Sequence, residues 1–382
     1  MKQMKIPAGV AAVLERLELA GREGYLVGGC VRDHVMGCTP HDYDVTTSAL
    51  PEETLAIFRG DRVIETGLQH GTVTVLTADG PVEVTTYRQD GTYSDHRHPD
   101  GVTFTRSLRE DLARRDFTMN AMAMGRSGAL EDPFGGREDI QRGLIRCVGE
   151  ADRRFEEDAL RILRGLRFAA RLGFALEEET AAAMDRKKEL LNTIARERVF
   201  SELCGLLQGV YAPEILAQYR AVVQSTLPEL DLSRCELLKA LPPEPALRLA
   251  ALLQREQAPG LLTRLKVSNE FRRTVLMLVE EREQLCPPER KAVRRRCAAL
   301  GAENFLLLCR YQQNERARQI AEALIREKAC LSIGDLAVNG RDLMGLGLRG
   351  AAIGRALEQL LEQVTEENIP NEKEALLQYL KQ

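Results

Sequence analysis

Residues 26–47 read LVGGCVRDHVMGCTPHDYDVTT, and this stretch decides how the front of the chain folds. An apolar run ends in Gly28-Gly29, as a strand does where it turns into a helix, and we expect that helix to begin near Val31. Glycines let backbone N–H groups approach a ligand, and a helix N-terminus favours anions. A Gly-Gly pair alone is more typical of a plain strand–helix turn, so its meaning depends on the residues beyond it in the chain.

Two aspartates spaced by two residues, Asp42 and Asp44, come directly afterwards. In a strand they would point to the same face, where neighbouring carboxylates repel unless a cation neutralises them. Mg²⁺ takes hard oxygen ligands and bridges substrate phosphates. A lone Asp-x-Asp is more often a solvated acidic loop, but its position just behind a Gly-Gly turn favours a metal site.

A third acidic candidate lies in PVEVTTYR, residues 81–88. Val82 and Val84 are expected to face one side of a strand and Glu83 the other. Three carboxylates from two strands can hold two metal ions and activate a hydroxyl for attack on a phosphate. An exposed strand residue explains Glu83 equally well.

Cationic and polar residues precede an apolar segment in RRDFTMNAMA, residues 114–123. Asn120 follows Asp116 by four residues, so the two are predicted to share one helical face. Arginines such as Arg115 are suited to triphosphate oxygens. The alternative is a helix capped by Asp116 with its arginines in solvent.

Residues 155–174, FEEDALRILRGLRFAARLGF, are predicted to form one amphipathic helix with a cationic stripe. The stripe consists of Arg161, Arg164, Arg167 and Arg171. Asp158 precedes Arg161 by three residues and is therefore expected to lie beside it. An ion pair on a solvated face would explain this spacing without any function.

The same pair also matches the edge of a nucleotide base. Cytosine and adenine each present an amino donor beside a ring-nitrogen acceptor, while uracil and guanine present the reverse order. The carboxylate of Asp158 can accept from the first and the guanidinium of Arg161 can donate to the second. Such a pair would select C and A and leave U and G mispaired.

Composition limits the class of protein. The chain has 382 residues, 44% hydrophobic and 29% charged, which suggests two to four domains of roughly 100–200 residues each. A net charge of −4 gives no global basic field, so any nucleic-acid surface must be local. Nine cysteines without a Cys-x-x-Cys pair indicate reduced thiols and a cytoplasmic protein. No apolar run approaches the roughly 20 residues of a membrane span.

The sequence changes character along the chain. Strand-like segments end by about residue 145, and from about Glu150 onward apolar residues recur at three- and four-residue intervals. We therefore predict an α+β protein, with a mixed α/β head followed by helical modules. Breaks between helices are expected near Gly209–Pro213, Pro242–Pro245, Pro287–Pro288 and Gly301.

Six segments in order resemble the successive motifs of the class II tRNA nucleotidyltransferases, the CCA-adding enzymes. They are GGCVRD, DYDVTT, VEVTTYR, RRDFTMNAMA, EEDALRILR and ARERVFSEL, and they cover residues 20–205 densely. The resemblance implies a polymerase β-type nucleotidyltransferase head with a palm-like sheet (1–147), then an all-α neck with a base-recognition helix (148–207), a body (208–300) and a tail (301–382). It implies template-independent addition of CCA to the 3′ end of tRNA from CTP and ATP.

The resemblance also assigns residues. Asp42 and Asp44 would be catalytic ligands of Mg²⁺, and Glu83 a third catalytic carboxylate. The implied nucleotide-binding residues are Gly28, Gly29, Arg32, Arg115, Asp116, Asn120, Asp158, Arg161 and Arg164. Among them Asp158 and Arg161, helped by Arg164, would be the template for the base. Residues 88–102 resemble the loop needed for adenine addition. The expected partners are tRNA, CTP and ATP, with no membrane and no obligate protein partner.

Alternatives remain open. An A-only or CC-only enzyme would keep nearly every motif. A poly(A) polymerase shares the head and neck motifs, but such enzymes tend to carry basic extensions that this chain lacks. A non-catalytic RNA-binding relative would be expected to lose a metal carboxylate. Phosphate contacts are expected from Arg272-Arg273 or from the cluster Arg290–Arg296, although either set can equally be a solvated face.

Overall fold

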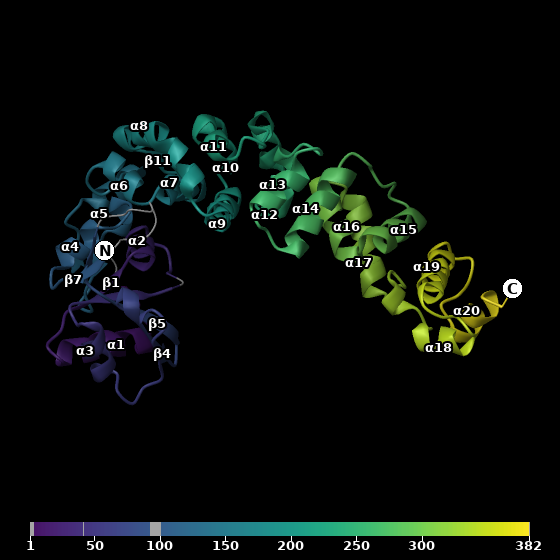
Figure 1. Ribbon diagram of the computed structural model, residues 1–382, viewed down its shortest axis with the longest axis horizontal. Helices are drawn as coiled ribbons and strands as arrows, with labels where there is room; N and C mark the ends of the chain where they lie inside the picture. Colours follow the sequence, from purple (N-terminus) through teal and green to yellow (C-terminus); the bar gives the residue numbers. More distant parts are fainter. Residues whose placement is uncertain (1–3, 41, 92–100, 382) are drawn as a thin grey trace. The chain divides into compact units, whose positions relative to one another are not determined.

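The computed structural model describes residues 4–40, 42–91 and 101–381. It divides into two compact units, Met1–Pro228 and Glu229–Gln382, each with its own packed interior. The first unit contains the strands and the second only helices, as the sequence pattern predicts (Figure 1). Within the described ranges, no helix combines the length and the apolar character that a bilayer crossing requires.

A seven-stranded sheet forms the centre of the first unit, in the order β3-β4-β5-β2-β1-β8-β9. Only β2 and β5 run parallel, and the other neighbouring pairs are antiparallel. The strands are β1 (Gly24–Val27), β2 (Asp44–Thr47), β3 (Val63–Ile64), β4 (Thr72–Thr77), β5 (Gly80–Thr86), β8 (Ala123–Met124) and β9 (Leu130–Glu131). A separate hairpin pairs β6 (Arg88–Asp90) with β7 (Val102–Phe104).

Alternation along the strands decides which side of the sheet is covered. In β5, Val82 and Val84 are buried and Glu83 is exposed, as predicted. Helix α1 (Ala8–Leu19) buries a stripe that includes Leu14 and Leu17, and it packs against β1 and against α3 (Pro51–Ile57). Figure 1 shows α1 and α3 side by side next to the strands. The apolar stripe of α1 therefore closes one face of the sheet.

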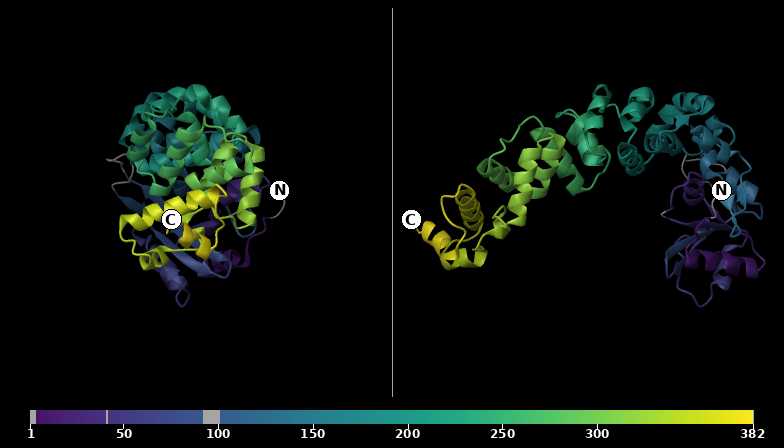
Figure 2. Two further views of the ribbon diagram at one scale, coloured as in Figure 1. Left: turned by 90° about the vertical axis from the view of Figure 1, so that its right-hand side faces the viewer. Right: turned by 180° about the vertical axis from the view of Figure 1, so that it is seen from behind.

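The remaining elements of the first unit are mostly helices, and Figure 2 shows them from two further sides. They are α2 (Gly29–Val35), η1 (Leu68–His70), α4 (Leu108–Ala113), η2 (Thr118–Asn120), α5 (Gly136–Arg142), α6 (Ala151–Glu157), α7 (Leu160–Leu172), α8 (Glu178–Lys187), η3 (Lys188–Thr193), α9 (Arg196–Leu207), α10 (Ala212–Gln218) and α11 (Arg220–Thr226). Two short strands, β10 (Leu144–Ile145) and β11 (Ala175–Leu176), pair in parallel. This ladder joins residues on both sides of the predicted head–neck boundary at 147/148, and that boundary remains a prediction.

The prediction of one helix over residues 155–174 is wrong. Helix α6 ends at Glu157, Asp158 is extended with φ −142° and ψ 101°, and α7 begins at Leu160. The Asp158 carboxylate accepts the backbone N–H of Leu160 at 3.1 Å. Aspartate competes for backbone hydrogen bonds in this way, so it favours the start of a helix over its interior.

Close backbone packing holds η2 against α5. A Cβ on Gly136 would overlap the carbonyl oxygen of Thr118, far inside van der Waals contact. The buried carboxylate of Asp139 in the same helix accepts the hydroxyl of Thr118. Because both contacts end on the first residue of η2, α5 fixes the place of this short helix.

The described residues of the second unit form helices joined by loops, with one isolated antiparallel bridge between Leu230 and Leu253. Its helices are η4 (Leu232–Ala240), α12 (Pro245–Leu252), α13 (Ala258–Arg264), α14 (Asn269–Glu281), α15 (Arg290–Leu300), α16 (Ala302–Tyr311), α17 (Glu315–Arg326), η5 (Ile333–Asp335), α18 (Gly340–Gly345), α19 (Ala351–Thr365) and α20 (Lys373–Tyr379). The predicted breaks at Pro242–Pro245, Pro287–Pro288 and Gly301 are confirmed, because each lies where one helix ends and the next begins. Leu343, Leu360 and Leu376 belong to a separate apolar cluster near the C-terminus.

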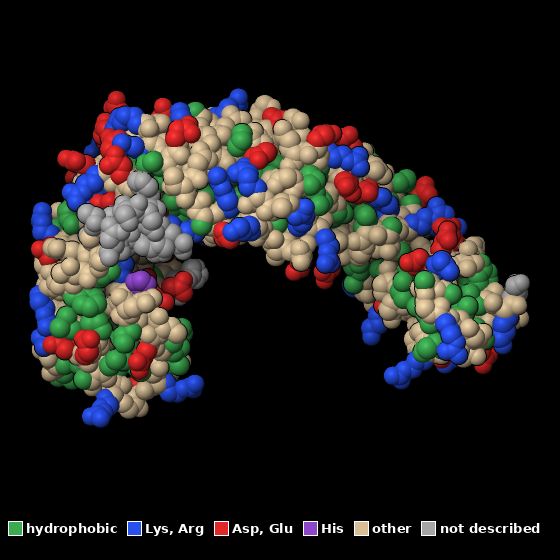
Figure 3. Space-filling model, viewed as in Figure 1, with side chains coloured by type: hydrophobic (Ala, Val, Ile, Leu, Met, Phe, Trp, Pro, Cys, Tyr) green, Lys and Arg blue, Asp and Glu red, His purple; other side chains and the backbone are tan. Residues whose placement is uncertain are grey.

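Ion pairs account for the cationic cluster of α15. Acidic and basic side chains are interspersed over the second unit in Figure 3. Within it, every cation of the cluster has a glutamate partner: Arg290 with Glu327, Lys291 and Arg295 with Glu366, Arg294 with Glu367, and Arg296 with Glu281. Only one of the four glutamates, Glu281, belongs to a neighbouring helix, α14. The other three directly follow α17 or α19, so these ion pairs connect α15 to the ends of those two helices. A phosphate contact by this cluster remains a prediction that competes with these pairs.

Candidate active site

Strand register brings the sequence motifs together at one edge of the sheet. Val27 of β1 lies opposite Asp44 of β2, and Asp44 lies opposite Glu83 of β5. Gly28 follows Val27 directly, so the Gly-Gly turn meets the carboxylate of Asp44 where β1 ends and β2 begins, beside Glu83 in the middle of β5. The prediction that Asp42 lies in the strand with Asp44 is wrong, because β2 begins at Asp44.

Two pockets share Asp42 and Asp44. One, of about 480 Å³, is lined by Pro7, Val10, Asp42, Tyr43, Asp44, Thr77, Asp79, Gly80, Pro81, Val82 and Glu83. The other, of about 470 Å³, is lined by Gly29, Cys30, Arg32, Asp33, Asp42, Asp44, Phe168, Arg171 and Leu172. The two aspartates therefore stand between a pocket on the sheet and a pocket that reaches α7.

The charge of Asp44 is not fully compensated. The side chain of Asp44 is exposed, but the protein around it removes part of its hydration and so raises the pKa of the carboxyl. The negative charges of Glu83 and Asp42 raise this pKa further, and Arg115 lowers it. In the described part of the chain, no three Asp, Glu, His or Cys side chains are gathered so as to hold a metal ion by themselves. Mg²⁺ usually takes only one or two carboxylates and completes its shell with water and substrate phosphates. Asp42 and Asp44 fit that mode, and a cation beside them would relieve the repulsion.

The turn at Gly28 faces an arginine. Gly28 has φ 73° and ψ −131° and precedes the first residue of α2, and this left-handed φ favours glycine. A Cβ built on Gly28 would lie 3.5 Å from Nη1 of Arg115. Among the described atoms, Nε of Arg115 is buried and has no hydrogen-bond partner. Nη1 is therefore the donor of Arg115 that lies beside the turn.

A chain of polar contacts runs from α2 to α7. Arg32 Nη1 donates to Asn120 Oδ1 at 3.0 Å, and Asn120 Nδ2 donates to Asp116 Oδ1 at 3.3 Å. Arg164 Nε then donates to Asp116 Oδ2 at 2.8 Å. The prediction that Asp116 and Asn120 share a helical face is wrong, because η2 begins only at Thr118; a tight turn joins their side chains instead. The guanidinium of Arg32 also lies 5.3 Å from the ring centre of Phe168.

The ionised form of Asp116 is favoured although the residue is buried. Burial would raise the pKa of Asp116, but the charge and hydrogen bond of Arg164, with the charge of Arg161, hold it below the ordinary value. A carboxyl with a lowered folded pKa stabilises the fold above its unfolded pKa of about 3.9, and this contribution is lost as the pH falls through the folded pKa.

Asp116→Asn is therefore expected to lower the free energy of unfolding by a constant amount near neutral pH, and the gap to the parent should close below about pH 4. Urea unfolding of the full chain across this range measures the gap. Asp185→Asn, which changes an exposed carboxylate of α8, is the matched control and should show little effect. A gap that widens as the pH falls would mean that the carboxyl is bound in its protonated form.

Asp158 and Arg161 lie close in the chain but each is bonded to another residue. Asp158 Oδ2 accepts from Arg198 Nη2 at 2.8 Å. Arg161, only 8% exposed, donates to Glu157 Oε2 at 2.8 Å and to the backbone oxygen of Arg114 at 3.0 Å. The predicted side-by-side pair on one helix is thus replaced by a carboxylate at a helix junction and a buried arginine on α7.

Acidic partners neutralise most of the predicted cationic stripe. Arg164 pairs with Asp116 and Arg167 pairs with Glu202 of α9 at 2.7 Å, whereas Arg171 is exposed and lines the pocket beside Asp42 and Asp44. Sequence reasoning missed Glu157, Arg198 and Glu202. The four-residue spacing of Glu157 and Arg161 is a signal that could have found the first. The other two belong to ARERVFSEL, and only the fold brings them to α7.

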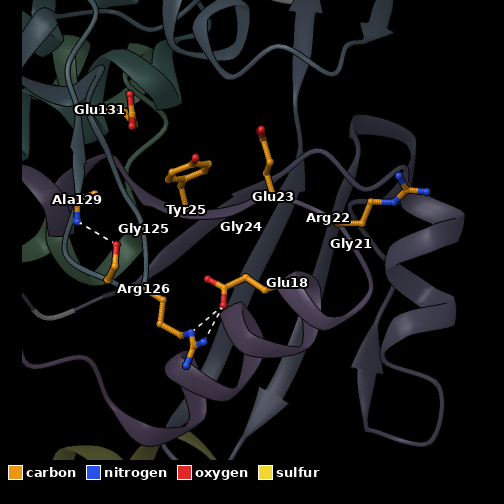
Figure 4. Close-up of a pocket in the computed structure, with 11 residues that line it drawn as sticks. Glu18, Gly21, Arg22, Glu23, Gly24, Tyr25, Gly125, Arg126, Ala129 and Glu131 are labelled. Carbon is orange, nitrogen blue, oxygen red and sulfur yellow. Dashed lines mark hydrogen bonds and ion pairs between the residues drawn. The ribbon is translucent and has the colours of Figure 1, made fainter.

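A larger pocket, of about 740 Å³, lies at the opposite end of β1. Figure 4 shows Tyr25 between Glu23 and Glu131, with Arg126 paired to Glu18. Burial and then the charges of Glu23, Glu131 and Glu18 raise the pKa of Tyr25. No residue of the sequence-derived site lines this pocket, so size alone does not mark the reactive centre.

Known protein families and structures match both the head and the helical part of the chain. Residues 24–146 match the family model for the poly A polymerase head domain, and residues 246–380 match that for tRNA nucleotidyltransferase domain 2. The CCA-adding enzyme of Latilactobacillus sakei is 38% identical over 97% of this chain and 96% of its own, and that of Geobacillus kaustophilus is 37% identical over 96% and 95%. The crystal structure of the Bacillus stearothermophilus CCA-adding enzyme in complex with CTP superimposes with a TM-score of 0.83 and 33% identity, covering 99% of this chain and 98% of its own. The crystal structure of a tRNA nucleotidyltransferase complexed with a primer tRNA and an incoming ATP analog superimposes with a TM-score of 0.64 and 27% identity. The match covers 83% of this chain and 99% of that protein.

Proposed function

Because the chain belongs to the family of CCA-adding enzymes, we propose that Asp42 and Asp44 carry its nucleotidyl transfer and that Asp158 and Arg161 choose the base. The reaction is addition of CCA to the 3′ end of tRNA from CTP and ATP. One observation supports this position of the active site. Gly28, Asp44 and Arg115 lie close together where β1 ends and β2 begins.

The chemistry follows from charge. Nucleotidyltransferases generally use divalent metal ions, and we infer Mg²⁺ for this chain, with Asp42 and Asp44 as the residues that would hold it. When bound, the ion would supply positive charge for the triphosphate and favour ionisation of the attacking 3′ hydroxyl. Arg115 and Arg32 neutralise the triphosphate charge on the side of Gly28, where the missing Cβ leaves room for a phosphate. Glu83 is the third carboxylate of the proposal and adds negative charge beside Asp44. Pyrophosphate leaves as the new phosphodiester forms.

Base choice requires an exchange of partners. The amino group of C or A would replace Arg198 on the carboxylate of Asp158, and the ring nitrogen would replace Glu157 at the guanidinium of Arg161. Arg164 supports this arrangement through Asp116 and Asn120, which reach Arg32 on the triphosphate side. These hydrogen bonds would therefore connect the residues at the base of a bound nucleotide with those at its triphosphate.

We assign the parts of the reaction to the four predicted domains. The head (1–147) performs the transfer, the neck (148–207) selects the nucleotide, and the body (208–300) and tail (301–382) hold the tRNA. The match of residues 24–146 to a polymerase head model supports the first of these. All nine cysteines are free, which supports the reducing cytoplasm as the place of action.

Product sizing tests the function and separates it from A-only or CC-only addition. A tRNA transcript that ends at the discriminator base should gain CC with CTP alone and the complete CCA with CTP and ATP together. A transcript that already ends in CC should gain one A with ATP. The loop predicted to govern the final A includes residues 92–100, which lie outside the described residues, so the experiment is the direct test. Failure to add CC would favour an A-only enzyme, and failure to add the final A would favour a CC-only enzyme. Addition of a long A tail would favour a poly(A) polymerase.

A further inference from the structure

Asp111 in α4 is a carboxylate with no contact to solvent, its side chain being 0% exposed. Its Oδ1 accepts from Arg114, through Nε at 3.0 Å and Nη2 at 2.8 Å, and from the backbone N–H of Arg88 at 3.4 Å. Its Oδ2 accepts from the hydroxyl of Thr46 and from Nη2 of Arg115, both at 3.2 Å. Residues of β2, β6 and the segment before η2 therefore meet on one carboxylate.

The two guanidinium groups around Asp111 are used differently. Arg114 donates two hydrogen bonds to Oδ1 of Asp111, whereas Arg115 donates one, from Nη2 to Oδ2. Nε of Arg115 is buried without a partner in the described part of the chain, and its Nη1 lies beside the turn at Gly28. Asp111 thus holds Arg115 through Nη2, and this leaves Nη1 for a contact beside the turn at Gly28.

Burying a carboxylate costs free energy unless opposite charges and hydrogen bonds compensate it. Burial raises the pKa of Asp111, but the charges and hydrogen bonds of Arg114 and Arg115 outweigh burial and leave it lowered. The carboxylate is therefore ionised at neutral pH, and an ionised group at a fixed place restricts Arg115 to one orientation.

From these contacts we propose that Asp111 is a positioning residue for nucleotide binding, acting through Arg115. The inference rests on the proposed contact between Arg115 and the triphosphate. Asp111 touches no reacting atom itself. It sets the direction in which Arg115 presents Nη1, so its loss affects the binding of CTP and ATP equally, since both carry the same triphosphate.

The test compares four variants of the full chain in single-nucleotide addition with Mg²⁺ and tRNA. Asp111→Asn is expected to raise KM for CTP and for ATP by about tenfold, because a misplaced donor loses most of a charge-assisted contact. Arg115→Gln should do the same. The double variant should be no worse than Arg115→Gln alone, because two residues that act through one contact are not additive. Arg114→Gln is the matched control: it removes the other guanidinium from the same carboxylate, so it should lower the melting temperature and leave KM near the parent value.

Each result decides between interpretations. If Asp111→Asn lowers the melting temperature and leaves both KM values unchanged, Asp111 is only structural and the inference is wrong. If Arg115→Gln leaves KM unchanged, the proposed contact of Arg115 with the triphosphate is wrong, and the inference about Asp111, which rests on it, is wrong as well. If Asp111→Asn does not fold, Thr46→Val removes one hydrogen bond from the oxygen that Arg115 uses, and binding of inorganic triphosphate should weaken by about threefold. Unchanged binding by that variant would also overturn the inference.

Discussion

Asp42→Ala and Asp44→Asn, made singly, are each expected to lower nucleotide incorporation by about 10³-fold or more while binding of tRNA stays within about twofold. Both carboxylates face the two pockets at the end of β2, and together they give the negative charge that a divalent cation needs there. Without either one, the proposed cation would lose a ligand and the triphosphate would no longer be aligned with the attacking hydroxyl. Single-turnover incorporation of CTP at saturating Mg²⁺ measures the loss, and a filter-binding assay measures tRNA affinity.

Asp79→Asn is the matched control for this pair. Asp79 lines the same pocket, and its Oδ2 accepts the backbone N–H of Gly9 at 2.6 Å, a hydrogen bond that an asparagine oxygen can keep. Incorporation by this variant should remain close to that of the parent. Turnover near the parent rate in Asp42→Ala would contradict the assignment. Equal losses in all three variants would mean that any carboxylate in the pocket matters through its charge alone.

Asp158→Ala should weaken base discrimination as well as rate. In the variant the amino group of C or A has no acceptor, while Arg161 can still donate to the carbonyl oxygens of U or G. A charge-assisted hydrogen bond contributes about 1.5–3 kcal/mol, so selectivity against UTP and GTP should fall by about one to two orders of magnitude. Competing incorporation of the four nucleotides onto a tRNA that ends at the discriminator base measures this ratio.

The ion pair of Asp158 with Arg198 makes a stability effect possible without any role in base choice, so a control is required. Asp152→Ala removes a carboxylate of α6 that pairs with Arg186 at 2.5 Å, and it should change melting temperature only slightly. Base choice should be unaltered in that variant. If Asp158→Ala excludes UTP and GTP as strongly as the parent does, the template assignment is wrong and its carboxylate is only a partner of Arg198.

Local patterns in the sequence predicted some of the elements at the proposed site. The alternation of Val82, Glu83 and Val84 is typical of a strand with one covered face. Gly28 adopts a positive φ, which glycine can do because it has no Cβ. Such signals depend on neighbours in the chain, so they can be read without a structure. The same holds for the proline and glycine breaks between helices of the second unit.

Predictions that needed contacts between distant residues fared less well. Spacing placed Asp158 beside Arg161, but Arg198 is 40 residues further along and competes for the same carboxylate. Asp116 and Asn120 do meet, but through a turn, because α5 packs η2 into place. A helical period describes one element at a time, so it cannot say which element will supply the partner of a charged side chain.

The contact between Gly136 and Thr118 affects how variants of this enzyme should be interpreted. Any side chain at position 136 would displace the start of η2, and η2 carries Asn120, two residues further on. In a genetic selection for growth, position 136 would therefore score as strictly as a catalytic aspartate, although glycine has no side chain with which to bind a nucleotide. A map of intolerant positions in this protein combines two kinds of site, those that touch the substrate and those that leave no room for an extra carbon.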